Sequence, residues 1–236
     1  MVTQDVSPSE LLRRTFLYRV LAGEGARFGA VAGAAVAMDF GRALEEEAGQ
    51  ARNLGIADLS PLARIGFKGA ETIAWLRNQG VEIGDRNNEG WLQPGGELVA
   101  RLADDEVLIL GDLGAAGKLC DRLGHGWSFD TAPRCYPVPR GESYAWVVVS
   151  GQNASAMLAK LCGVDLRSGK FAQRAVAQTS LAQMTVILIR HDLGAIPAFY
   201  LLFDSASADY LWSCLRDAMS EFGGRPVGLA ALRELA

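Results

Sequence analysis

An internal duplication is the sequence feature that most constrains the fold of this chain. The stretch FKGAETIAWLRNQGVEI, residues 67–83, matches VVSGQNASAMLAKLCGVDL, residues 148–166, in the order of its features. Each copy begins with apolar residues, turns at a glycine, and continues as an Ala-rich amphipathic segment. Each then ends in Gly-Val, an acidic residue and an aliphatic residue. Gly69 and Gly80 frame the first copy, and Gly151 and Gly163 frame the second.

A second pair of matching stretches follows in the same order. DEVLILGDLGAAGKLCDRLG, residues 105–124, resembles AFYLLFDSASADYLWSCLRDA, residues 198–218: an apolar strand, a turn, then a helix with leucines at helical spacing. The two matches indicate an α+β unit of roughly 80 to 95 residues that occurs twice, a period too long for a solenoid repeat.

The expected fold class is α+β, built as two pseudosymmetric halves that face each other across a shared cavity. Helical and strand patterns interleave, but several strands follow one another through short turns. This favours mixed or antiparallel sheets over a doubly wound parallel sheet. We predict an N-terminal extension over 1–55 that packs on the core, a first half over 56–135 and a second half over 136–236. The segment 124–143, with three prolines and three glycines, joins the halves.

Local patterns predict the individual elements. A capping box at Ser7-Pro8-Ser9-Glu10 predicts a helix through ELLRRTFLYRVLAG. The Ala- and Val-rich run 28–38 predicts a short buried strand, with a helix packed through small residues as the alternative. Further helices are expected near 42–55, 70–78, 114–123, 152–161 and 206–222. A strand is expected to follow the turn at Ser60-Pro61 and to end at Lys68, with others near 98–102, 106–110, 144–151, 176–180, 185–190 and 199–203. A terminal helix within 226–236 is expected to be exposed and to form a partner interface.

Composition excludes several functional classes. A net charge of −4 gives no electrostatic reason to expect a nucleic acid or an anionic membrane as partner. The four cysteines form no CxxC pair and there are two histidines, so no metal site is predicted. The N-terminus is polar and acidic, unlike a signal peptide, and the apolar run 28–38 is too short to span a bilayer. We therefore expect a soluble, cytoplasmic protein.

No strong catalytic motif is present. The chain has no P-loop, no GxSxG elbow and no strand–GxGxxG–helix arrangement. Cys135 beside Arg134 has the neighbour of a reactive thiolate but is more simply a loop cysteine. The pair His191-Asp192 is more simply a solvated turn than a catalytic base pair, and the same holds for the acidic run 104–106. The sequence predicts no catalytic residue.

Three stretches carry a resemblance to a known family. They are ARFGAVAGAAVAMDFG (26–41), RNLGIADLSPLARIGFKGAETIAWL (52–76) and GGRPVGLAAL (223–232). In this order they resemble the folate-binding family that includes the glycine cleavage T-protein, over about residues 15–232. That family's core consists of two related α+β halves. Its full-length members carry a further C-terminal β-barrel, and this chain ends before the place of such a barrel.

Within that family, the second half is most similar to the gamma subunit of heterotetrameric sarcosine oxidase. The stretches that carry this similarity are LADDEVLIL (102–110), SGQNASAMLAKLCGVDLRSGKF (150–171), VAQTSLAQMTVILIR (176–190) and FYLLFDSASADYLWSCL (199–215). The resemblance implies a small subunit that supports a large complex, whose flavin lies on a partner subunit.

The chain departs from the transferase members of the family at two positions. The resemblance places a pair of functional aspartates at Gly95-Gly96, and glycine cannot accept a proton. It also implies a pterin-binding glutamate after Arg190, but the loop HDLGAIPA (191–198) contains none. A register shift of one or two residues would bring Glu97 to the acidic position. The candidate folate-binding residues are therefore Asn87, Asn88, Glu97 and Arg190.

Two functions are compatible with these patterns. The first is a non-catalytic, gamma-type accessory subunit of a multisubunit flavin-dependent amine oxidase or demethylase, partnered by larger flavoprotein and folate-binding subunits. The alternative is a minimal aminomethyltransferase-like protein of one-carbon metabolism that binds tetrahydrofolate itself.

Overall fold

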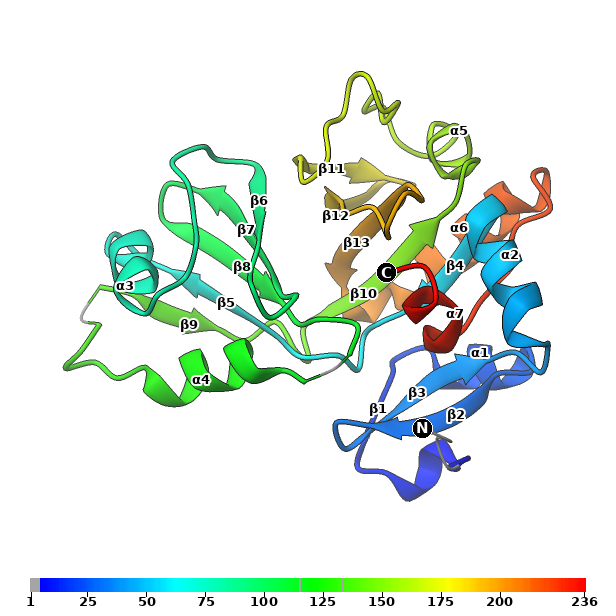
Figure 1. Ribbon diagram of the computed structural model, residues 1–236, viewed down its shortest axis with the longest axis horizontal. Coiled ribbons are helices and arrows are strands. Elements are labelled where there is room, and N and C mark those ends of the chain that lie inside the picture. Colours follow the sequence, from blue (N-terminus) through cyan, green and yellow to red (C-terminus); the bar gives the residue numbers. More distant parts are fainter. Residues whose placement is uncertain (1–4, 115, 133) are drawn as a thin grey trace.

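Two sheets carry the two halves, and the five strands of the first correspond in order to the first five of the six strands of the second (Figure 1). The computed structural model describes residues 5–114, 116–132 and 134–236. The first sheet has the order β6-β7-β8-β5-β9, with β5 Arg64–Lys68, β6 Glu89–Leu92, β7 Leu98–Ala103, β8 Glu106–Leu110 and β9 Tyr136–Val138. The second has the order β11-β12-β13-β10-β4-β14, with β4 Gly55–Asp58, β10 Tyr144–Ser150, β11 Val176–Leu181, β12 Met184–Arg190, β13 Ala198–Asp204 and β14 Arg225–Pro226.

The helices repeat in the same way. A short helix follows β5 and β10, and a longer one follows β8 and β13: α3 Thr72–Asn78 and α4 Lys118–Gly126 in the first half, α5 Ala154–Leu158 and α6 Ala208–Ser220 in the second. All strand pairs in the two sheets are antiparallel except β4–β14, which is parallel. The predicted α+β class with mixed and antiparallel sheets is confirmed.

Each sheet includes one strand from the chain segment that leads into the other half. Strand β4 comes just before β5 in the chain but pairs with β10 of the second sheet. Strand β9 comes just before β10 but pairs with β5 of the first sheet. The boundaries at 55/56 and 135/136 stay predictions; β4 spans the first boundary and β9 lies directly after the second.

The glycines that open the two duplicated turns occupy equivalent positions. Gly69 has φ +138°, and a Cβ there would lie 2.2 Å from the carbonyl oxygen of Arg134, just before β9. Gly151 has φ +116°, and a Cβ there would lie 2.3 Å from the carbonyl oxygen of Asn53, just before β4. Both positions therefore require glycine for its backbone conformation and for the close approach of the exchanged connection.

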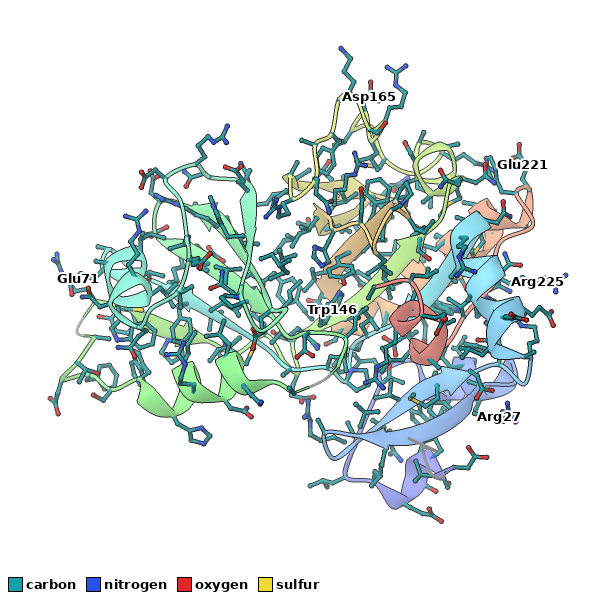
Figure 2. All side chains as sticks on the ribbon, in the orientation of Figure 1. Arg27, Glu71, Trp146, Asp165, Glu221 and Arg225 are labelled. Carbon is teal, nitrogen blue, oxygen red and sulfur yellow. The ribbon has the colours of Figure 1, made fainter. Side chains whose placement is uncertain are left out.

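The two sheets meet edge to edge at β6 and β11. The Gly90 N–H donates to the Arg174 carbonyl at 2.8 Å, and the Val176 N–H donates to the Asn88 carbonyl at 3.0 Å. A shared apolar core fills the space behind this junction. Its members come from both sheets and from the C-terminal helix, and they include Leu98, Leu110, Trp146, Tyr200, Leu202 and Leu232. Trp146 is labelled near the middle of Figure 2.

The N-terminal residues form a third, small sheet, at the bottom right of Figure 1. Its order is β1-β3-β2, with β1 Arg13–Arg14, β2 Arg27–Val31 and β3 Ala34–Asp39. The run 28–38 is thus a hairpin of two strands, and the helical alternative is wrong. The helix expected after the capping box is also wrong in extent. A 3-10 turn, η1 Pro8–Glu10, is followed by β1, and the helix α1 is confined to Tyr18–Gly23.

The C-terminal helix α7, Leu229–Arg233, is not the exposed element that the sequence suggested. It packs on β3 and on α2, Leu44–Leu54. Leu229 and Leu232 are at most 1% exposed. The buried carboxylate of Glu47 in α2 accepts the N–H of Gly228, the residue before α7, at 2.9 Å and so ties the start of α7 to α2. The helix is therefore part of the core.

The remaining helical turn is η2, Ser205–Ser207. Within the described residues, no helix has both the length and the apolar character needed to cross a membrane.

Candidate functional site

A cavity of about 420 Å³ lies between the two halves, where the ends of several strands converge. The turn between β6 and β7 and the segment after β8 form one side, and the segment after β12 with β13 forms the other. Its lining residues are Leu92, Gly95, Gly96, Leu98, Gly111, Asp112, Leu113, Gly114, His191, Asp192, Leu193, Gly194, Tyr200 and Ala236. The volume lies within the usual range for small-molecule sites.

Tyr200 and His191 supply the polar groups on the second-half side. Tyr200 is 3% exposed, and its hydroxyl has no hydrogen-bond partner among the described residues. Burial raises the pKa of this phenol, so the group stays protonated and can donate. The His191 ring lies 5.2 Å from the Tyr200 ring, and its Nδ1 is buried without a partner in the described part of the chain. Burial lowers the pKa of His191, which favours the neutral imidazole.

The first-half side of the cavity offers backbone rather than functional side chains. A Cβ on Gly95 would lie 2.4 Å from Oε2 of Glu97, and Gly96 has φ +90° with a Cβ position 3.2 Å from Cβ of Asp112. An aspartate at Gly95 would displace the Glu97 carboxylate, and one at Gly96 would be strained by the positive φ. The two positions expected for the functional aspartates are therefore built for glycine here.

Two carboxylates nevertheless line this cavity. Asp112 follows β8, and its Oδ1 accepts the Ala116 N–H at 3.2 Å. Asp192 forms a two-pronged ion pair with Arg190, with Nε–Oδ1 at 2.9 Å and Nη2–Oδ2 at 2.8 Å. Asp192 is thus neutralised by its partner, whereas Asp112 forms no ion pair among the described residues. The sequence analysis did not single out Asp112 or Tyr200. The signal that could have found them is their position just after β8 and within β13, the matching strands of the duplication.

Asn87 and Asn88 lie away from this cavity. The Asn87 side-chain amide donates to Oδ1 of Asp104 at 2.9 Å in an exposed turn. Asn88 has φ +56°, and its Oδ1 accepts from Nε2 of Gln178 at 3.0 Å. Asn88 therefore helps to join the two sheets at the β6–β11 junction.

Glu97 and Arg190 are buried, and both form hydrogen bonds with other groups of the protein. Oε1 of Glu97 accepts the Leu119 N–H at the start of α4, at 3.1 Å. Besides its ion pair, Arg190 donates from Nη1 to the carbonyls of Phe171, at 2.7 Å, and Ser168, at 3.3 Å. The structure does not bring the four candidates together in one described cavity, and their assignment to a ligand remains a prediction.

Arg190 does form part of a second, larger groove on the second half, of about 750 Å³. The exposed face of α5 and the loop after it line this groove, with residues Gln152, Ser155, Ala156, Ala159, Cys162, Gly163, Val164, Asp165, Leu166, Arg167, Ser168, Arg190, Pro197 and Phe199. Asp165, labelled at the top of Figure 2, pairs with Arg167 at 2.5 Å. With the Asp165–Arg167 pair exposed and each nitrogen of Arg190 hydrogen-bonded, the groove has no unpaired buried polar side-chain atom among its described residues.

The cysteines do not form a reactive site. Cys120, Cys135 and Cys162 are buried, and burial raises the pKa of Cys120 to about 12. The pKa of Cys135 is raised as well, mainly by burial, so the arginine next to it in sequence does not produce a thiolate. Among the described residues, no group of three or more His, Cys, Asp or Glu side chains could hold a metal ion.

Comparison with known proteins places this geometry in a family. The model of the GCVT N-terminal domain matches residues 17–236. The chain belongs to the GCVT family. The resemblance found in the sequence is therefore confirmed at this level.

Curated relatives of this GCVT chain are aminomethyltransferases. That of Acidobacterium capsulatum is 23% identical over 245 aligned positions, which cover 98% of this chain and 64% of the relative. That of Saccharopolyspora erythraea is 28% identical over 137 positions, which cover 56% of this chain and 35% of the relative. The chain thus spans less than two thirds of the length of these relatives.

Two solved structures share the GCVT fold. The glycine cleavage system aminomethyltransferase T from Bartonella henselae has a TM-score of 0.71 at 20% identity, covering 95% of this chain and 62% of that protein. A chain of the heterotetrameric sarcosine oxidase from Corynebacterium sp. U-96, in complex with pyrrole 2-carboxylate, has a TM-score of 0.66 at 21% identity. That match covers 89% of this chain and 96% of the oxidase chain.

Proteins of the GCVT family generally bind tetrahydrofolate. The cavity between the halves fits the hydrogen-bonding ring part of such a ligand, because Nδ1 of His191, a lining residue, is buried without a partner among the described residues. Tyr200, His191 and Asp112 are the residues that would hold the ring. When bound, a folate supplies an acceptor for one-carbon units.

Proposed function

We propose that this chain is a non-catalytic, gamma-type accessory subunit of a sarcosine oxidase-like complex, a multisubunit flavin-dependent amine oxidase or demethylase. Its partners would be larger flavoprotein and folate-binding subunits, with the flavin on a partner, in the cytoplasm. The proposal fits a chain organised as an extension, 1–55, and two halves, 56–135 and 136–236.

The glycine backbone at the expected acidic positions is the observation that carries this proposal. Proton transfer needs a side chain within hydrogen-bond reach of the reacting group. Gly95 and Gly96 have none; a side chain at Gly95 would require the Glu97 carboxylate to move, and one at Gly96 would be strained by its φ of +90°. Glu97 is next in sequence, but its Oε1 is already engaged by the backbone of α4. The cavity therefore has no carboxylate at the two positions where the resemblance places the functional aspartates, although Asp112 lines it from the segment after β8.

The similarity to a sarcosine oxidase chain supports the same proposal. The two chains match over nearly the whole of that oxidase chain, whereas the match to the aminomethyltransferase covers 62% of that enzyme. At these identities the likeness concerns the fold, so the assembly needs a direct test.

Affinity purification of the full chain from its native host tests the accessory role. We expect a stable complex that contains a larger subunit with the visible absorbance of bound flavin. A carrier protein with the same tag, expressed in the same host, controls for non-specific capture. A chain that elutes as a monomer, with no flavoprotein at any purification step, would overturn the proposal. Deletion of 226–236 is not a useful interface test, because α7 is part of the core.

The alternative is a minimal aminomethyltransferase-like protein that binds tetrahydrofolate itself. The names of the curated relatives favour it. Here Asn87, Asn88, Glu97 and Arg190 remain the candidate binding residues. Calorimetry with tetrahydrofolate, followed by a single-turnover assay for one-carbon transfer, separates the two functions. Turnover that is lost in Glu97→Gln, at unchanged stability, would establish the alternative and exclude a purely accessory role.

A further inference from the structure

Three aromatic side chains form an exposed cluster at the end of the first half. They are Trp127, Phe129 and Tyr136, and we call them the aromatic patch. The Phe129 ring lies 4.8 Å from the Trp127 ring and 6.2 Å from the Tyr136 ring. Phe129 is 66% exposed and Tyr136 is 46% exposed. Tyr210, the other exposed aromatic residue of the described chain, has no aromatic ring beside it. The aromatic patch is therefore a continuous apolar surface, which marks an interaction site.

The segment that carries the patch leads from α4 to β9, at the left of Figure 1, on the side of the first half that faces away from the second half. It covers 127–135, whereas the short segment 221–224 is enough to lead from α6 to β14 in the second half. The repeated fold therefore does not require a connection of this length. Loops that the scaffold does not need are common places for binding residues.

The segment is anchored, so the patch is formed before a partner binds. Ala132 and Cys135 are at most 1% exposed, and Nε1 of Trp127 donates to the Cys135 carbonyl at 2.5 Å. Arg134 donates from Nε to Oε1 of Glu71 at 2.8 Å, and its carbonyl accepts the Glu71 N–H at 3.1 Å. A surface held in this way loses little conformational freedom on binding, which favours its use as an interface.

The charges beside the patch restrict the partner. Within 127–138, the charged residues are Asp130 and Arg134. Arg134 is neutralised by Glu71, whereas Asp130 is exposed and forms no ion pair among the described residues. Aromatic residues are enriched at the centres of protein interfaces, and complementary charges at the margin select the partner. The complementary surface is therefore an apolar pocket with a basic side chain at its margin.

The open edge of β9 restricts the way in which the partner binds. Strand β9 is the outermost strand of the first sheet, and its middle residue, Pro137, has no N–H to donate. A short edge strand that contains proline is a poor template for an added strand. The partner therefore contacts the side chains of the patch and does not extend the sheet.

We infer that the aromatic patch docks into an apolar pocket with a basic margin on the larger subunit of the complex proposed above. Phe129 is the residue that enters the pocket, and Asp130 pairs with the basic side chain at its margin. The inference rests on the proposed accessory role and assigns a contact surface to it.

Single replacements in the tagged full chain, expressed in the native host in place of the wild type, test this surface. Phe129→Ser should lower the flavin absorbance that co-purifies per chain about 10- to 100-fold, the effect of losing a central interface residue. Tyr210→Ser, which also removes an exposed aromatic ring, should leave the absorbance unchanged. The loss of flavin in a high-salt wash should be smaller for Asp130→Asn than for the wild type. Asp209→Asn, at another exposed carboxylate, is the control and should behave like the wild type.

Hydrogen exchange of the wild-type complex is a second measurement that needs no variant, so it stays valid if Phe129→Ser fails to fold. The N–H groups of 127–132 should exchange more slowly in the complex than in the free chain, whereas those of 205–211 should be unchanged.

The outcomes separate the contact surface from the accessory role. Full flavin recovery with Phe129→Ser, or equal exchange of 127–132 in the complex and the free chain, would overturn the inference and leave the accessory role intact. A wild-type chain that carries no flavoprotein would overturn both. Self-association of the pure chain that Phe129→Ser abolishes would assign the aromatic patch to a second copy, and the inference would then be wrong.

Discussion

The four glycines that frame the duplicated stretch allow backbone strain and steric exclusion to be measured separately. Gly151 has φ +116° and lies against the backbone of Asn53, with 2.3 Å from its Cβ position to the carbonyl oxygen. Gly80 has φ +76° but no heavy atom within 4 Å of its Cβ position. Gly163 has neither a positive φ nor such a neighbour. Substitution by alanine therefore adds strain and a clash at Gly151, strain alone at Gly80, and neither at Gly163.

The expected costs follow from these differences. Left-handed backbone costs an L-residue about 1–2 kcal/mol, so Gly80→Ala should lower the free energy of unfolding by about that amount. An extra methyl group forced against fixed backbone adds about 1–3 kcal/mol, which brings Gly151→Ala to about 2–5 kcal/mol. Gly163→Ala should stay within about 0.5 kcal/mol of the wild type. Gly69→Ala should behave like Gly151→Ala, because its Cβ position lies 2.2 Å from the Arg134 carbonyl oxygen.

Urea unfolding followed by tryptophan fluorescence measures all four variants. The midpoint should fall in the order Gly163→Ala, Gly80→Ala, then the two close-approach variants, with an unchanged slope against denaturant. If Gly151→Ala costs no more than Gly80→Ala, the close approach does not constrain the backbone. The argument that the exchanged connections are clamped at these turns would then be wrong.

Three further predictions concern side chains. Burial lowers the pKa of His191; Arg174 adds to this shift and Asp192 opposes it. The neutral imidazole therefore contributes stability above the unfolded pKa of about 6.5, and this contribution is lost as the pH falls through and below that value. The wild type should thus lose stability relative to His191→Gln between about pH 7 and pH 5, by at most about 1.4 kcal/mol per pH unit in urea unfolding, and a constant difference would contradict this. A thiol-reactive disulfide reagent should modify the half-buried Cys214 first. Cys120, whose pKa is raised to about 12, should react only when the protein unfolds. In Cys214→Ser the fast phase of the reaction should be absent. Glu97→Ala should cost about 0.5–2 kcal/mol by removing the acceptor at the start of α4, whereas the exposed Glu82→Ala should cost under about 0.5 kcal/mol; equal costs would refute the capping role.

Much of the fold could be predicted because its two halves repeat the same pattern. Strands such as β7, β8, β12 and β13 are apolar runs bounded by turns, and each occurs at matching places in the duplication. The exchange of β4 and β9 could not be foreseen, because local patterns do not encode which distant strand a segment pairs with. The capping box at Ser7 is likewise local. It formed its contact, Ser7 N–H to Glu10 Oε2 at 3.3 Å, but the sheet pairing of Arg13 and Arg14 ended the helix.

The candidate site was harder to predict than the fold. Glu97 and Arg190 are the residue types expected at a binding site, but burial with backbone partners gives each a structural role. The glycines at 95 and 96 could be proposed as departures from the sequence, since a missing side chain is visible without coordinates, and this assignment stays a prediction. It gave no reason to select Tyr200, because an aromatic residue in an apolar strand is usually core. Only the unpaired hydroxyl distinguishes it.

The exchange of strands has a consequence for the order in which the chain can fold during synthesis. Strand β4 leaves the ribosome before its partner β10 has been made, because the two are separated by most of the first half. At roughly 5–20 residues per second, the wait lasts from about 5 to 20 s. During that interval β4, all of whose residues are buried in the finished protein, has no sheet to join. The first half cannot complete a separate unit either, since β9 is the last of its strands to be made. Folding is therefore delayed until the second half emerges, and the nascent chain is a natural client for chaperones.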